Sequence, residues 1–198
     1  RNWYLLTNSV VLMWIVLTLV AVTIHRFVDQ PLWLMVHVPL LGAATAAILI
    51  WSQHFSDTLL RRPAPAGRLG LGVRLTNHTV GAALVIAGMP SGVVALVTAG
   101  AIAVGIAIIT HAVVLTLQMR AALPARFAPL VRYYVAASVV FLGGIALGSL
   151  MPVFPAMADR FVTAHIILNA YGWIGLTAFG TLVLLWPTVL HARMPDTA

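Results

Sequence analysis

Cysteine and charged side chains are the residue types that this sequence conspicuously lacks. No cysteine is present, which excludes disulfides, iron–sulfur clusters and thiolate metal sites. Only 8% of the 198 residues are charged, whereas a soluble domain has about 25%. Because 62% of the residues are hydrophobic, the composition predicts an all-α integral membrane protein.

Stretches without charge predict six membrane-spanning helices in a single domain, residues 1–198. Residues 75–119 contain no charge over 45 positions, about 68 Å of helix and roughly twice a hydrocarbon core. This segment must therefore fold back, and the sequence GMPSG at residues 88–92 is its strong turn signal. The expected spans cover residues 8–26, 31–54, 75–89, 92–119, 131–151 and 161–190.

Arginine accounts for every one of the eleven Lys and Arg residues, and its distribution predicts the orientation of the bundle. Arg26 and Arg160 are the arginines of the first and fifth connections. The others flank the second and fourth connections and the tail, or begin the chain: Arg1, Arg61, Arg62, Arg68, Arg74, Arg120, Arg126, Arg132 and Arg193. The positive-inside rule then places both termini in the cytoplasm of a multi-pass plasma-membrane protein. Because the arginines flank spans that contact the lipid bilayer, the net charge of +7 does not indicate nucleic-acid binding.

Seven histidines are unusual for such a chain, because ionisable groups inside a membrane are costly and commonly functional. His37 and His165 lie at nearly equal depth in the outer leaflet, on the second and sixth helices. Two imidazoles at one height on different helices are what a bis-histidine haem b or a metal ion requires. His54 and His111 form a second candidate pair in the cytoplasmic half. The structural alternative for each pair is hydrogen bonding between helices.

Polar residues near the outer pair complete the candidate site. Asn169, one helical turn after His165, is expected either to orient that imidazole or to form a hydrogen bond between helices. Arg26 and Arg160 lie on the outer side, where they are placed to pair with haem propionates, or with a neighbouring aspartate each.

Small residues follow the predicted site along two helices. Gly172 and Gly180 share a helix face with His165, and Gly144 and Gly148 form a GxxxG motif in the fifth helix. Such positions either leave room for a flat porphyrin or let two helix backbones pack closely.

Four segments together resemble the N-terminal membrane region of actinobacterial copper oxidase and copper nitrite reductase-like proteins. They read VHVPLLGAATAAILIWSQHFSDTLLR, THAVVL, RFAPLVRYYVAASVVFLGGIALG and AHIILNAYGWIGLTAFGTLVLLWPTVLHARM. Their histidine-bearing helices are also distantly similar to haem–copper oxidase subunit I. The resemblance implies haem ligation by His37, His54, His111 and His165, and leaves His78 outside the pattern. It also implies a cupredoxin-type partner outside the membrane; copper is expected only there, because this chain has no His-Cys-His-Met copper set.

Together these features predict a membrane-embedded electron-transfer module with one b-type haem, or two if the inner pair also binds. Quinol is the expected electron donor and an extracytoplasmic copper centre the acceptor. Such a module is a domain of an oxidoreductase rather than a complete enzyme, and it has no catalytic residue of its own. The alternatives are a histidine-based metal or proton transporter and a structural membrane anchor; the oligomeric state is left open.

Overall fold

The fold is a bundle of long helices, seen here in a computed structural model that describes residues 2–123 and 128–190. Six helical stretches in this part of the chain are long and apolar enough to cross a membrane, which confirms the predicted class. The longer elements are α1 (Asn2–Thr23), α2 (Pro31–His37), η2 (Val38–Ala44), α3 (Thr45–Leu59), α4 (Gly67–Gly88), α5 (Val94–Ala121), α6 (Ala128–Leu150), α7 (Ala158–Ile167), η4 (Leu168–Gly175) and α8 (Leu176–Val189). Two short turns, η1 (His25–Phe27) and η3 (Pro155–Met157), precede α2 and α7.

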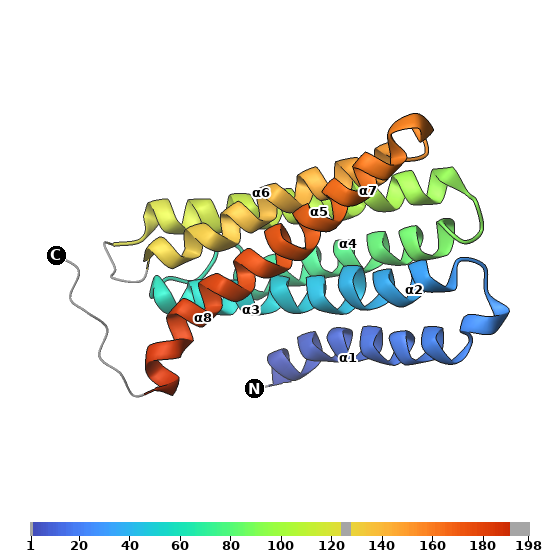
Figure 1. Cartoon of the computed structure of the whole chain (residues 1–198). Coiled ribbons are helices and arrows are strands. Elements are labelled where there is room, and N and C mark those ends of the chain that lie inside the picture. Colours follow the sequence, from blue (N-terminus) through green and yellow to red (C-terminus); the bar gives the residue numbers. More distant parts are fainter. Residues whose placement is uncertain (1, 124–127, 191–198) are drawn as a thin grey trace.

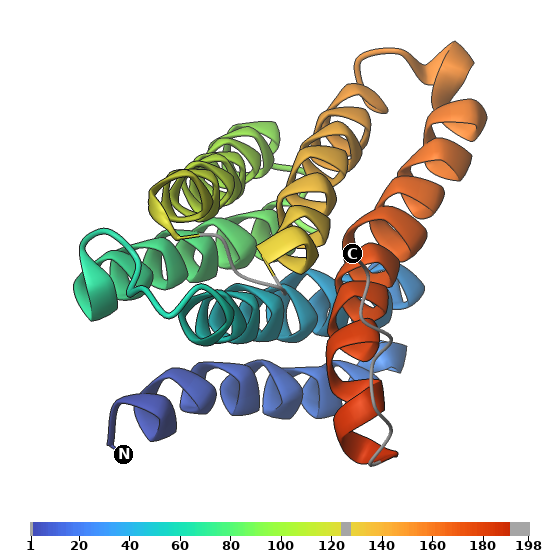
Figure 2. The same ribbon diagram turned by 90° about the vertical axis from the view of Figure 1, so that its left-hand side faces the viewer.

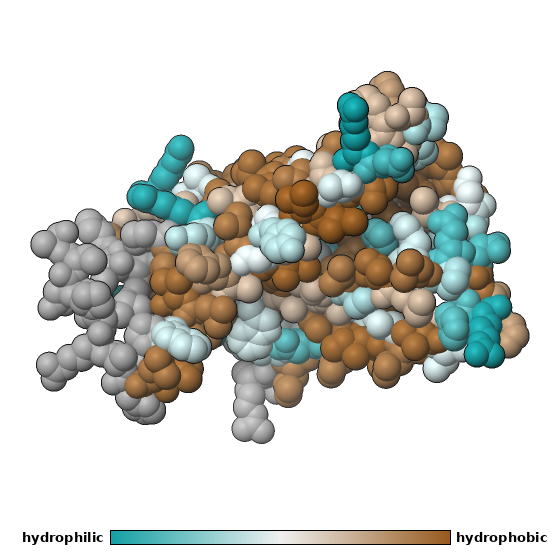
Figure 3. Space-filling model, in the orientation of Figure 1, coloured by the Kyte–Doolittle hydropathy of each residue, from teal (hydrophilic) through white to brown (hydrophobic). Residues whose placement is uncertain are grey.

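The helices run up and down side by side, so that α1 begins and α8 ends at the same end of the bundle (Figure 1). The helices α2, η2 and α3 form one continuous span, as do α7, η4 and α8 (Figures 1 and 2). Hydrophobic side chains cover the middle of the face seen in Figure 3, and hydrophilic ones gather towards the ends. This distribution suits a bundle surrounded by lipid.

The closest helix pair, α4 and α5, depends on two glycines that face one another. A Cβ atom on Gly81 would lie 2.8 Å from the carbonyl oxygen of Gly100, and one on Gly100 would lie 2.6 Å from that of Gly81. Only glycine permits this approach, which maximises van der Waals contact between helices that gain little from the hydrophobic effect in lipid.

The observed helix ends differ from those predicted by charge alone. The helix α4 begins at Gly67, two turns before the predicted start. Arg68 and Arg74, which were expected in the preceding connection, are therefore helical. Arg74 is 3% exposed and donates a hydrogen bond to Gln53 Oε1 at 2.8 Å, so it is a buried packing residue rather than a loop charge. The turn in residues 88–92 is as predicted, with Gly92 at φ +68° between α4 and α5. Arg126 and Arg193 lie outside the described residues.

Each of the two outer histidines precedes a π-helical segment of its span. In η2, Pro39 has no N–H to donate to a carbonyl in the preceding turn, which interrupts the α-helical pattern. The side chains of Thr45 and His78 donate hydrogen bonds to the carbonyl oxygens of Leu40 and Leu41, at 3.0 and 2.9 Å. These bonds satisfy backbone groups that lipid could not.

Candidate bis-histidine site

The structure brings His37 and His165 together. Their ring centres are 6.2 Å apart and their planes differ by 27°. His37 is the last residue of α2 and His165 lies in α7, and the backbones of these two helices do not pack against one another along their length. The two imidazoles therefore approach each other between helices that are far apart in sequence.

A backbone carbonyl fixes the protonation of each imidazole. The Nδ1 atom of His37 lies 2.8 Å from the Trp33 carbonyl oxygen, and that of His165 lies 2.8 Å from the Gly144 carbonyl oxygen. Because a carbonyl oxygen can only accept, each Nδ1 must hold a hydrogen, and in the neutral imidazole each Nε2 then keeps its lone pair. Neither Nε2 has a hydrogen-bond partner within the described residues. Metal-binding histidines have this arrangement, in which the second nitrogen is anchored by a carbonyl oxygen.

Close packing fixes the orientation of both rings. The indole of Trp33 stacks on His37, with 4.0 Å between ring centres and 12° between planes. On the other helix, a Cβ atom at Gly148 would lie only 3.0 Å from Cε1 of His165, and one at Gly144 would overlap the Asn169 side chain. The GxxxG motif of α6 therefore gives space to His165 and Asn169 themselves.

In the structure, Asn169, Gly172 and Gly180 make contacts other than those expected for a porphyrin site. Asn169 Nδ2 donates to the backbone carbonyl of His165 at 2.7 Å, so the ring is oriented by Gly144 and not by this amide. Gly172 faces Val140, and a Cβ at Gly180 would lie 2.8 Å from Cβ of Tyr133. Both glycines thus permit close packing of the last span on α6, which was the alternative interpretation.

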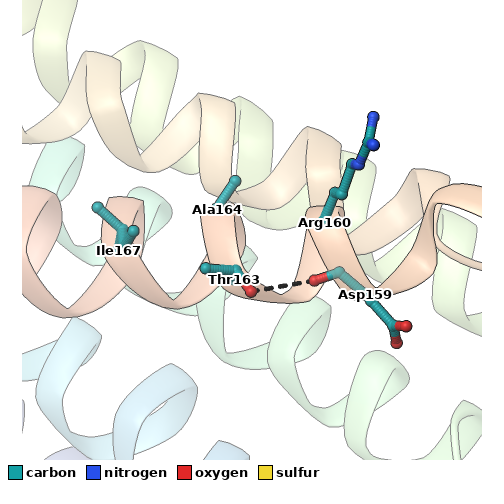
Figure 4. Close-up of a pocket in the computed structure, with 5 residues that line it drawn as sticks. All are labelled: Asp159, Arg160, Thr163, Ala164 and Ile167. Carbon is teal, nitrogen blue, oxygen red and sulfur yellow. Dashed lines mark hydrogen bonds between the residues drawn. The ribbon is translucent and has the colours of Figure 1, made fainter.

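Arg26 and Arg160 are exposed at the end of the bundle that also holds the two histidines. Figure 4 shows that Arg160 and Asp159 point in different directions from α7. The groove that they border has a volume of about 450 Å³ and is also lined by Thr163, Ala164 and Ile167. The pairing of these arginines with propionates stays a prediction.

The second predicted pair does not face a common site. Nδ1 of His54 lies 2.8 Å from the Tyr4 hydroxyl of α1, whereas Nε2 of His111 lies 2.9 Å from the Ser52 hydroxyl of α3. Ser52 and His54 are two residues apart, which is about 200° around a helix. His54 therefore points to α1, on the opposite side of α3 from His111. Equal depth did not imply a shared face, and we correct this part of the prediction.

A buried polar cluster at the same end as His54 was not predicted from the sequence. The Gln53 amide accepts from Arg74 and donates to Oδ1 of Asp57 at 2.9 Å. Gln118 of α5 donates to the same carboxylate oxygen at 2.8 Å and to the carbonyl of Arg62. A neutral amide thus separates a buried cation from an anion, and the cluster joins α3, α4 and α5. The sequence carries no clear signal for this cluster, because Gln53, Arg74 and Gln118 are far apart in the chain and lie in three different helices.

Within the described ranges, no three or more His, Cys, Asp or Glu side chains are placed to share a metal ion. No protein-family model, curated protein or solved structure matches the chain. The class that the fold and site define is thus a multi-pass helical membrane protein with two apposed imidazoles.

Proposed function

We propose that this chain is a membrane-embedded b-type cytochrome module that holds one haem between His37 and His165. The observation that supports this most strongly is the separation of the two rings. A metal–imidazole bond is about 2.0–2.1 Å long, so two imidazoles on opposite sides of one metal have ring centres about 6.5 Å apart. The observed 6.2 Å is close to that value.

The number of donors favours haem over a bare metal ion. A structural zinc takes four protein ligands and a catalytic zinc takes three. The iron of haem already has four porphyrin nitrogens, so two imidazoles complete its coordination. A transporter would need a site that exchanges its ligand, whereas both of these rings are fixed by backbone hydrogen bonds and packing.

The bound haem would supply a one-electron iron couple. The protein's own part is to fix both tautomers and to hold the rings by stacking and packing. His37 and His165 would both hold the iron and leave no open position on it, which would suit electron transfer rather than oxygen chemistry. Quinol in the bilayer is the proposed donor, and an extracytoplasmic cupredoxin-type copper centre the acceptor. The proposal includes a plasma-membrane location with both termini in the cytoplasm, as the arginine bias favours.

Haem content in matched histidine variants tests this function. Purified wild-type protein should be red, with the sharp reduced α-band of a b-type cytochrome and about one haem per chain. His37→Ala and His165→Ala should each lose the haem, whereas His54→Ala and His111→Ala should keep it. A colourless wild type that binds divalent metal would favour the transporter instead, and full haem retention in His37→Ala and His165→Ala would reject the assignment.

A further inference from the structure

Trp33 contacts the imidazole of His37 in two separate ways. Its backbone carbonyl oxygen lies 2.8 Å from Nδ1 of His37, and its indole covers one face of the imidazole, with 4.0 Å between ring centres and 12° between planes. A hydrogen bond tolerates a range of angles, so by itself it leaves the ring some freedom to turn, whereas a stacked indole opposes that rotation. Because the hydrogen bond uses the backbone, replacing the side chain of Trp33 removes the stack alone.

The position of Trp33 also allows a simpler interpretation, which the stack argues against. Tryptophans near the ends of membrane spans commonly anchor a helix at the interface of lipid and water, and Trp33 lies in the first turn of α2. An anchor of this kind faces the headgroups, but the indole of Trp33 is half-buried and lies almost parallel to the ring of His37. Trp51 of α3, which is 41% exposed and meets His54 edge-on, fits the anchoring role better.

The ring of His165 is held by a different helix. Its Nδ1 bonds to the Gly144 carbonyl oxygen of α6, and its Cε1 lies beside Gly148 of the same helix. The two imidazole planes, which differ by 27°, are therefore set independently, by the Trp33 indole on one side and by α6 on the other. Removal of the indole should turn the ring of His37 and leave that of His165 in place.

We propose that Trp33 is a positioning residue that keeps the imidazole of His37 nearly parallel to that of His165. The consequence for iron rests on the proposed function, because the angle between two axial imidazole planes determines how far the dxz and dyz orbitals of ferric haem differ in energy. Near-parallel rings separate these orbitals and give a rhombic low-spin electron paramagnetic resonance (EPR) spectrum. Crossed rings leave them nearly equal and give a highly anisotropic spectrum. A residue that orients a metal ligand in this way tunes the metal without touching it.

EPR spectra of the purified ferric protein test this role with haem bound. Wild type should give a rhombic low-spin spectrum. Trp33→Leu should keep its haem, because the backbone carbonyl and both Nε2 atoms remain, but its spectrum should broaden and its largest g value should increase. Trp33→Phe keeps an aromatic ring and should restore the wild-type spectrum, and Trp51→Leu, which removes an indole from α3, should not change it. A highly anisotropic wild-type spectrum, or identical spectra of wild type and Trp33→Leu, would overturn the proposal.

Nuclear magnetic resonance of the haem-free full chain tests the same role without the cofactor. Histidine is labelled with ¹³C at Cε1 in lipid nanodiscs, and the resonance of His37 is assigned by its absence in His37→Ala. A stacked indole shields the proton on this carbon, so Trp33→Leu should move the resonance downfield, and Trp33→Phe should restore most of the shielding. An unchanged resonance in Trp33→Leu would overturn the proposal. A wild type without haem would reject the proposed function instead, and this comparison would still decide the role of Trp33.

Discussion

At the residue scale, His165 depends on glycines of the neighbouring helix. Its Nδ1–H donates to the Gly144 carbonyl, and its ring occupies the space beside the missing Cβ of Gly148. Both interactions involve the Nδ1 and Cε1 atoms of the ring and leave Nε2 uncontacted by these two glycines. The two glycines therefore determine where the Nε2 lone pair points.

Gly148→Ala should displace the imidazole of His165, because the new methyl group would lie 3.0 Å from its Cε1. Interactions that orient a metal ligand typically change metal affinity by about 10–100-fold, and we expect haem to be lost about tenfold faster. The measurement is the transfer of haem to excess apomyoglobin. Gly105→Ala is the control, since a Cβ there meets no atom within 4 Å; equal rates in the two variants would contradict the role given to Gly148.

Arg74→Met should destabilise the bundle, because it leaves Oε1 of Gln53 without its buried donor. A buried group that loses its partner costs about 1–3 kcal/mol. Unfolding in mixed detergent micelles of increasing SDS fraction measures this loss. Arg68→Met, at an exposed position of the same helix, is the control and should unfold like the wild type. If both variants unfold alike, the cluster around Arg74 does not contribute to stability.

The sequence predicts that His37 and His165 lie at the same depth, and in the structure their side chains also point towards one another, with ring centres 6.2 Å apart. The depths of His54 and His111 were predicted in the same way, but their side chains point in different directions. Depth along a helix follows from counting residues, but direction depends on how each helix is rotated, and a uniformly apolar span gives no strong signal for that rotation. The bond from His165 to Gly144 was also beyond prediction, because any residue has a carbonyl.

At the element scale, the π-helical segments η2 and η4 set the rotation of each outer histidine relative to the rest of its span. A π-turn adds a residue to an α-helix and is frequent at functional sites. The proline in η2 was a visible signal for a break, but η4 has no proline, and its π-turn could not be predicted. The six spans themselves were predictable, because hydrophobic length is a property of the sequence alone, whereas their ends were not.

Deletion of Leu40 should remove one residue from the π-helical segment η2 and turn α2 by about 100° relative to α3. His37 would then point away from His165, so haem binding should be lost while the helical content stays. Haem per chain and far-ultraviolet circular dichroism measure the two effects. Leu40→Ala keeps the chain length and should retain the haem; retention after the deletion would show that the π-turn is not needed.

At the scale of the whole molecule, the orientation in the membrane is testable without removing native thiols, because the chain has no cysteine. Single cysteines at Asp29 and Pro63 would lie at exposed positions in connections at opposite ends of the bundle. In intact spheroplasts, a membrane-impermeant thiol reagent should label Asp29→Cys and not Pro63→Cys. Lysed cells provide the control, in which both should react; the reverse pattern in intact spheroplasts would invert the proposed topology.

The backbone of α7 packs against α6, and α2 packs against α1 and its own η2, while the rings of His37 and His165 approach each other between α2 and α7. A group bound by both imidazoles would therefore be a non-covalent cross-link between the first and last hairpins of the chain. Assembly of the module would then finish only after the sixth span has been synthesised and inserted. Before that moment His37 would have no partner, so incorporation of the cofactor would have to follow translation instead of accompanying it.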